Sequence, residues 1–137
     1  MTPEILARIT TARAAHDLSD LARQAVAATA ETTDPAERII QARRLRQLAN
    51  EVVDRVVLAE ALGGASWQEI TDALNRQDAD TVRREYEDAV AQWNAMSEEE
   101  KAAAAEGFED VDRWYARHRE DYDPPLSTPV ADLLNRY

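Results

Sequence analysis

The chain of 137 residues has no cysteine, three glycines, five prolines and a single lysine, Lys101. Without cysteine, disulfides, thiolate metal sites and cysteine nucleophiles are excluded, which fits a reducing cytoplasm. The scarcity of glycine and proline leaves few positions for turns and favours long helices. No strand signal and no internal repeat is visible, and the bias toward arginine and alanine is common in proteins from GC-rich genomes.

Long apolar runs are also missing. None approaches the roughly 20 residues that a membrane-spanning helix needs, and residues 1–10 do not resemble a signal peptide. The length suits one ordinary domain with room for an appendage. We therefore expect a cytoplasmic protein that makes no membrane contact.

Negative charge is concentrated in the second half of the chain. The net charge is −11, yet residues 1–65 hold 9 acidic and 8 basic residues, whereas residues 66–137 hold 18 and 8, a net −10. DNA binding depends largely on neutralising phosphates. A protein this acidic therefore needs a local basic patch to bind DNA.

Two long helices are predicted, over residues 3–31 and 35–62. Each begins with a capping residue followed by proline, Thr2-Pro3 and Asp34-Pro35, because proline suits the first helical position. Gly63-Gly64 ends the second helix in a conformation that glycine tolerates. The two helices should form a long antiparallel hairpin.

The apolar faces of these two helices differ. The first helix has one stripe at helical spacing, and from Leu45 onward the second helix has an apolar surface too broad for a single stripe. We therefore expect the second helix to be the central rod of the fold, covered on two sides. A homodimer is a candidate assembly, since two-fold pairing would bury what one chain leaves exposed. The stripe of the first helix consists of Ile5, Ile9, Ala12, Ala15, Ala22, Val26 and Ala30.

A short helix over residues 67–74 and a longer one from 78 to 93 are predicted next. Ser66 and Glu69 have the spacing of a capping box, in which the glutamate reaches back to the serine. Asn75 follows where a left-handed residue is needed, and asparagine accepts that conformation better than most residues. These features predict two helices joined by a tight turn.

An acidic helical appendage is predicted over residues 96–137. Carboxylates at 98–100 lie at the positive start of a helix, and Gly107 is a candidate break before a further apolar face. Thr128-Pro129 starts a short final helix. The fold is thus predicted to be all-α, with the hairpin and the two shorter helices in residues 1–95 and the appendage in 96–137.

One sequence pattern runs through residues 42–93. It consists of Arg43-Arg44, Gly64-Ala65-Ser66-Trp67, Glu69-Ile70, Ala73-Leu74-Asn75, Val82-Arg83-Arg84 and Tyr86. The pattern resembles a helix-turn-helix that is widespread in small actinobacterial proteins. The resemblance implies that Trp67, Ile70 and Leu74 pack the short helix onto the next helix, whose outer face would enter the major groove of DNA.

The surface of this unit departs from that of a typical DNA reader. Asp78 and Asp80 lie where phosphates would be, and residues 67–93 hold 7 acidic and 3 basic residues, a net −4. An aspartate can still accept a hydrogen bond from a cytosine amino group. The predicted DNA-binding residues are Gln77, Thr81 and Arg84 toward the bases, with Arg76, Arg83, Arg43 and Arg44 toward phosphates.

Two charged regions have alternative interpretations. The arginines at 38, 43, 44 and 46 could hold phosphates, or could form a solvated helix face that pairs with the acidic half. Residues 98–123 hold 10 acidic and 4 basic residues, which could shield the arginines, bind a basic partner, or serve only as solubilising surface.

Two functions follow. The first is a small DNA-binding or transcription-associated protein of bacterial or phage origin. The alternative is an acidic protein–protein interaction module, such as an adaptor or a phage- or plasmid-encoded inhibitor, whose helix-turn-helix does not contact DNA.

No enzyme activity and no cofactor are expected, because no nucleophile motif, phosphate loop or dinucleotide fingerprint is present. His16 and His118 each have an aspartate nearby but no evident third ligand, so no metal site is predicted.

Overall fold

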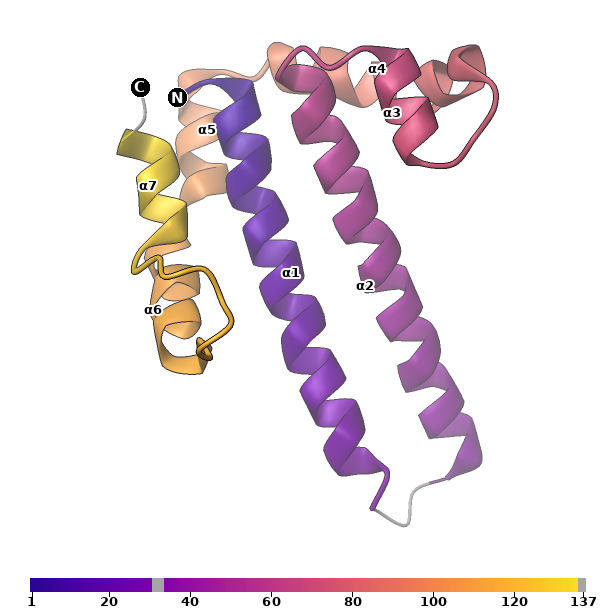
Figure 1. The fold of residues 1–137 in the computed structure, drawn as a ribbon, viewed down its shortest axis with the longest axis vertical. Coiled ribbons are helices and arrows are strands. Elements are labelled where there is room, and N and C mark those ends of the chain that lie inside the picture. Colours follow the sequence, from indigo (N-terminus) through magenta and orange to yellow (C-terminus); the bar gives the residue numbers. More distant parts are fainter. Residues whose placement is uncertain (31–33, 136–137) are drawn as a thin grey trace.

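The computed structural model describes residues 1–30 and 34–135, which form helices and connecting turns without a strand. α1 and α2 form a long antiparallel hairpin, with α3 and α4 at one end and α5 to α7 on the other side of α1 (Figure 1). The predicted all-α hairpin is confirmed. The helices are α1 (Pro3–Ala28), α2 (Pro35–Leu62), α3 (Trp67–Ala73), α4 (Ala79–Asn94), α5 (Glu98–Ala105), α6 (Phe108–His118) and α7 (Pro129–Asn135).

The helix starts follow the local capping chemistry. The Thr2 hydroxyl accepts from the Ile5 amide at 3.2 Å, and the Asp34 carboxylate accepts from the Ala36 amide at 3.2 Å. Gly107 has φ +82°, a left-handed conformation that separates α5 from α6. The expected end of the first helix at residue 31 lies outside the described residues.

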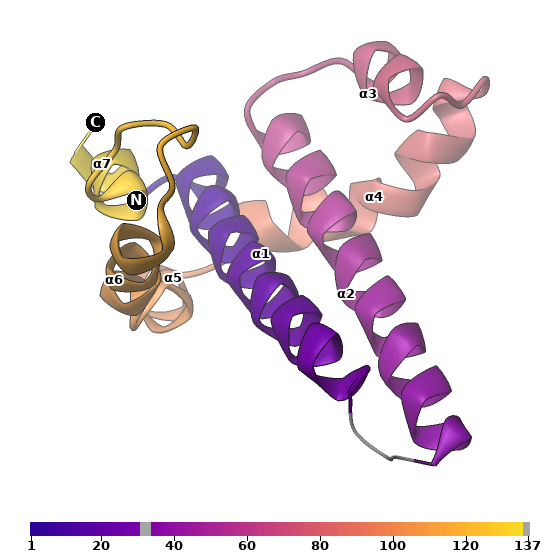
Figure 2. The same cartoon turned by 60° about the horizontal axis from the view of Figure 1, so that its bottom comes forward.

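The start of α1, rather than α2, is the centre of the fold. Ile5, Leu6 and Ala7 are consecutive and all buried, and consecutive residues of a helix point in different directions. α1 is therefore enclosed by several elements, namely α2 with α4 on one side and α5 to α7 on the other (Figure 2). The C-terminal helices contribute Val111 and Val130 to this core.

The expectation that α2 is a central rod is wrong. Its buried residues lie in the single run Val57–Ala59, while Val53 and Val56 remain 46 % and 42 % exposed. The stripe predicted for α1 is likewise buried only in its first half, since Val26 is 72 % exposed. Both helices lack cover in the part of the hairpin that extends beyond α3 to α7.

A buried carboxylate holds the last helix in place. Asp112 on α6 is 5 % exposed and accepts from the amides of Val130 at 2.8 Å and Ala131 at 2.9 Å. These amides are at the start of α7, where helix amides have no partner within the helix. The cap is therefore supplied from another helix.

Within residues 1–30 and 34–135, no helix combines the length and the hydropathy of a membrane span.

Replacing Asp112 with alanine should remove both acceptors and leave two buried amides unpaired. We expect the free energy of unfolding to fall by about 2–6 kcal/mol, at roughly 1–3 kcal/mol for each unpaired group. Chemical denaturation followed by circular dichroism measures the loss. Asp112→Asn, which keeps one carbonyl acceptor, should lose less; equal losses for the two variants would contradict the proposed cap.

Candidate nucleic-acid interface

The α3–α4 unit is joined to α2 by one apolar cluster. Its buried members are Val57 from α2, Ile70 from α3 and Val82 from α4, with Trp67 and Tyr86 packed against them. The packing predicted from the sequence for the short helix against the longer one is therefore present. The angle between α3 and α4 is fixed by a shared core and by the turn between them.

The turn uses the residues expected for it, with one difference. Asn75 has φ +57°, as predicted, and the Arg76 amide donates to the Thr71 carbonyl at 3.0 Å. Ser66 accepts from the Glu69 amide at 3.1 Å, but the Glu69 carboxylate accepts from the Ser66 hydroxyl rather than from its backbone. The full reciprocal capping box occurs instead at Ser97, which starts α5.

A hydrogen bond links the middle of α4 to α2. The Tyr86 hydroxyl donates to the Asp54 carboxylate at 2.8 Å. Partial burial, followed by this hydrogen bond, raises the pKa of Tyr86 from 10.0 to about 12. Ionising the phenol would place a second negative charge beside the exposed Asp54 carboxylate, so the pair holds α4 in place while Tyr86 is neutral.

The basic residues of the predicted DNA-binding surface are engaged with acids of the same unit. Arg76 donates two hydrogen bonds of 2.8 Å to the two oxygens of Glu85. This bidentate contact raises the pKa of Arg76 and lowers that of Glu85, so the pair stays ionised at neutral pH. Arg83 lies 3.5 Å from Asp80 and 3.7 Å from Glu87.

The start of α4 is organised by Asp78. Its carboxylate accepts from the Asp80 amide at 3.0 Å and from the Thr81 hydroxyl at 2.5 Å. The hydrogen bond from Thr81 lowers the pKa of Asp78. Asp78 therefore serves as a helix cap, and the Thr81 hydroxyl, predicted to face the bases, already has a partner within the turn.

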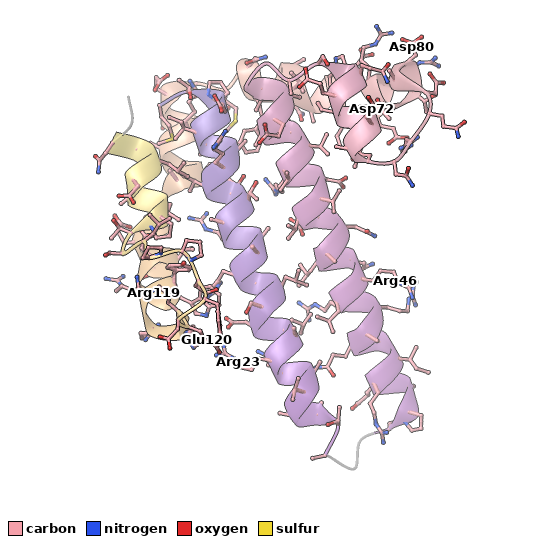
Figure 3. The ribbon with its side chains drawn as sticks, in the orientation of Figure 1. Arg23, Arg46, Asp72, Asp80, Arg119 and Glu120 are labelled. Atoms are coloured by element: carbon pink, nitrogen blue, oxygen red, sulfur yellow. The ribbon has the colours of Figure 1, made fainter. Side chains whose placement is uncertain are left out.

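The remaining predicted residues do not form one patch. Gln77 and Arg84 are exposed on the α4 side, and Arg43 and Arg44 are exposed on α2. Arg43 precedes Asp54, where α4 meets α2, by 11 residues, or about 16 Å at 1.5 Å per residue. Figure 3 shows the neighbouring Arg46 well down α2, away from Asp72 and Asp80.

The exposed side of α4 is thus weakly acidic. Residues 76–88 hold 5 acidic and 3 basic residues, and two of the three arginines are beside carboxylates of the same unit. A surface that neutralises its own arginines offers little field to attract phosphates. The pairs that decide this, Arg76 with Glu85 and Arg83 with Asp80 and Glu87, were not predicted from the sequence.

The two histidines lie together around Trp114. His16 meets the indole edge-on at 4.8 Å between ring centroids, and His118 lies at 5.3 Å. His118 Nε2 is 2.9 Å from an Arg23 nitrogen, and its Nδ1 is 2.9 Å from the Trp114 carbonyl. In the part of the chain that the structure describes, no group of three or more potential ligands could hold a metal ion.

Comparisons with models of protein families, with curated proteins and with solved structures gave no match. The resemblance to actinobacterial helix-turn-helix proteins therefore stays a prediction from the sequence pattern.

The Tyr86–Asp54 pair predicts how stability depends on pH. Because the pKa of Tyr86 is raised on folding, its contribution is complete below pH 10 and is lost as pH rises toward 12. Tyr86→Phe should remove most of this loss and cost about 1 kcal/mol of unfolding free energy at pH 7. Urea denaturation of both proteins at pH 7 measures the cost of the substitution. The same measurement at about pH 10 and about pH 11.5, where tyrosine ionises, measures the loss of stability at high pH.

The control for this experiment is Tyr122→Phe, because the Tyr122 side chain is 98 % exposed. That substitution should leave both the stability at pH 7 and its decline at high pH unchanged. An equal decline in wild type and Tyr86→Phe would contradict the assigned role of Tyr86.

Proposed function

We propose that the protein is a protein-interaction module built on a helix-turn-helix scaffold, and that the outer face of α4 binds a basic surface of a partner protein. The observation that carries the proposal is the internal pairing of Arg76 with Glu85 and of Arg83 with Asp80 and Glu87. It leaves the unit without the basic patch that an acidic DNA-binding protein needs.

The face of α4 opposite its buried side is built for exposure. Asp80, Arg84 and Glu87 recur at helical spacing and are all exposed, while Val82 and Tyr86 point to the core. Complementary charge of this kind accelerates association and selects among partners more than it strengthens binding.

The second candidate function is DNA binding, and one observation favours it. The left-handed turn at Asn75 and the core shared by α3 and α4 support a helix-turn-helix arrangement. Gln77, in the turn just before α4, and Arg84, in the second turn of α4, are both exposed, near the helix start where such units contact bases. This function would require the phosphate contacts to come from arginines that are now paired with carboxylates.

The first experiment uses the full chain as bait in a bacterial lysate. We expect a partner that is retained at about 50 mM salt and released at high salt, since exposed charges are screened. With the partner purified, Asp80→Arg with Glu87→Arg should weaken binding at least tenfold, roughly 1.4 kcal/mol. Glu99→Arg with Glu109→Arg changes the charge equally on other helices and should weaken it less.

Absence of a salt-sensitive partner, or equal loss of binding in the two double variants, would overturn the assignment of the α4 face. Circular dichroism of each variant establishes that it is folded.

The second experiment tests DNA directly. Binding of the wild-type protein to short mixed-sequence duplexes is measured by fluorescence anisotropy at about 50 mM salt, where phosphate contacts are strong. The protein-interaction proposal predicts no binding by the wild type, and weak binding once Glu85→Gln releases Arg76. Binding by the wild type that is lost in Arg84→Ala would establish the DNA function instead.

A further inference from the structure

One side of the α1–α2 hairpin presents exposed small apolar side chains from both helices. Among them Val26 is 72 % exposed, Val53 46 % and Val56 42 %. Within each helix, successive exposed apolar residues are three, four or seven positions apart, which places them on a single stripe. The stripe of α1 contains Ala15, Ala22 and Val26, and the stripe of α2 contains Ala42, Ala49, Val53 and Val56, all exposed.

The two stripes lie on the same side of the hairpin. The half-buried residues of the α1–α2 contact include Leu18 on α1 and Leu45 on α2. At roughly 100° per residue, the exposed stripe of each helix is rotated from these contact residues by about a quarter of a turn around the helix axis, in the same sense for both helices. Both helices are right-handed and they run antiparallel, so the same rotation brings both stripes to one side. Figure 1 shows the two helices without another element in front of them over most of their length.

The other helices pack elsewhere. α4 contacts α2 through Leu58 and Ala59, and α3 contacts it through Val57, so neither covers the stripe that contains Ala49 and Val53. We term the two exposed stripes together the hairpin face.

We propose that the hairpin face binds a second copy of this chain, with the two α2 helices antiparallel and the two-fold axis at Ala49. The product is a four-helix bundle made of two hairpins. It buries the apolar surface that a single folded chain leaves in water, and such burial is the main driving force for association.

The charge of the hairpin favours a second copy over other partners. Residues 15–56 hold 7 acidic and 6 basic residues, a net −1, in a chain whose net charge is −11. Two identical hairpins of nearly zero net charge do not repel one another, whereas a nucleic acid or a strongly basic protein would find no complementary net charge here. The excess negative charge is carried by other parts of the chain.

The size of the face matches a dimer. The 28 residues of α2 extend over about 42 Å, and two helices packed side by side are roughly 20 Å wide. The face therefore offers roughly 800 Å² to a partner, which is what one side of a standard interface contributes. At its α3 end it continues into an apolar hollow of about 310 Å³, lined in part by Val52, Ile70 and Leu74.

The positions along α2 are reciprocal about Ala49. Ala42 and Val56 are seven residues before and after it, so an antiparallel partner brings Ala42 of one chain against Val56 of the other. Small residues then face larger ones, and the paired Ala49 residues allow close approach at the axis. This interdigitation is how packed helices fill space.

The mass of the full chain in solution tests the proposal. Light scattering coupled to gel filtration at micromolar concentration should give twice the 15.4 kDa of one chain. Ala49→Glu should return the protein to a monomer, because it places two carboxylates together on the axis. Asn50→Glu adds the same charge one residue away, outside the face, and should remain dimeric. A monomeric wild type, or equal behaviour of the two variants, would overturn the proposal.

Disulfide cross-linking tests the antiparallel register. Because the chain has no cysteine, only the introduced cysteines can form a disulfide. Oxidised Ala49→Cys should form a covalent dimer, since Cβ atoms on the axis can approach to roughly 4 Å. Ala42→Cys should not cross-link with itself, while Ala42→Cys combined with Val56→Cys should. Efficient self-linking of Ala42→Cys would show parallel pairing and refute the proposed arrangement. Both tests report on assembly and are independent of what α4 binds.

Discussion

The fold depends on the complete burial of the first turns of α1. Ile5, Leu6 and Ala7 are consecutive, so no single neighbour can cover them, and elements from both sides must close around the helix. α2 and α4 cover one side, and α6 and α7 cover another. The C-terminal helices thereby belong to the core of the N-terminal hairpin, and Asp112 holds α7 in the position that this core requires.

The same packing leaves two surfaces without cover from other helices. The acidic outer face of α4 lies at one end of the hairpin, and the nearly neutral apolar hairpin face extends away from it. On the α4 face, two arginines form ion pairs with carboxylates of the same unit. The hairpin face is exposed because no other helix covers it. In the proposed antiparallel dimer the two α3–α4 units would be at opposite ends, so that one assembly presents two copies of the α4 face.

Much of the local structure was predictable from the sequence. Thr2, Asp34 and Asn75 act at short range, because a cap or a left-handed turn involves residues only a few positions apart. The packing of Trp67 and Ile70 on α4 was also predictable, since the pattern of apolar residues specifies both helix faces. The roles of α1 and α2 were not: a broad apolar surface on α2 suggested a central rod, yet Val53 and Val56 are exposed.

By itself the sequence determined that the chain is helical, where most helices begin and end, and that its second half is acidic. These properties are set by caps, periodicity and composition, which act locally or as sums over the chain. Only the tertiary structure decided which apolar stripe is covered, that Asp112 caps a helix 18 residues away, and that Glu85 rather than a phosphate receives Arg76. Those outcomes depend on distances between segments far apart in the chain, and no spacing within one helix encodes them.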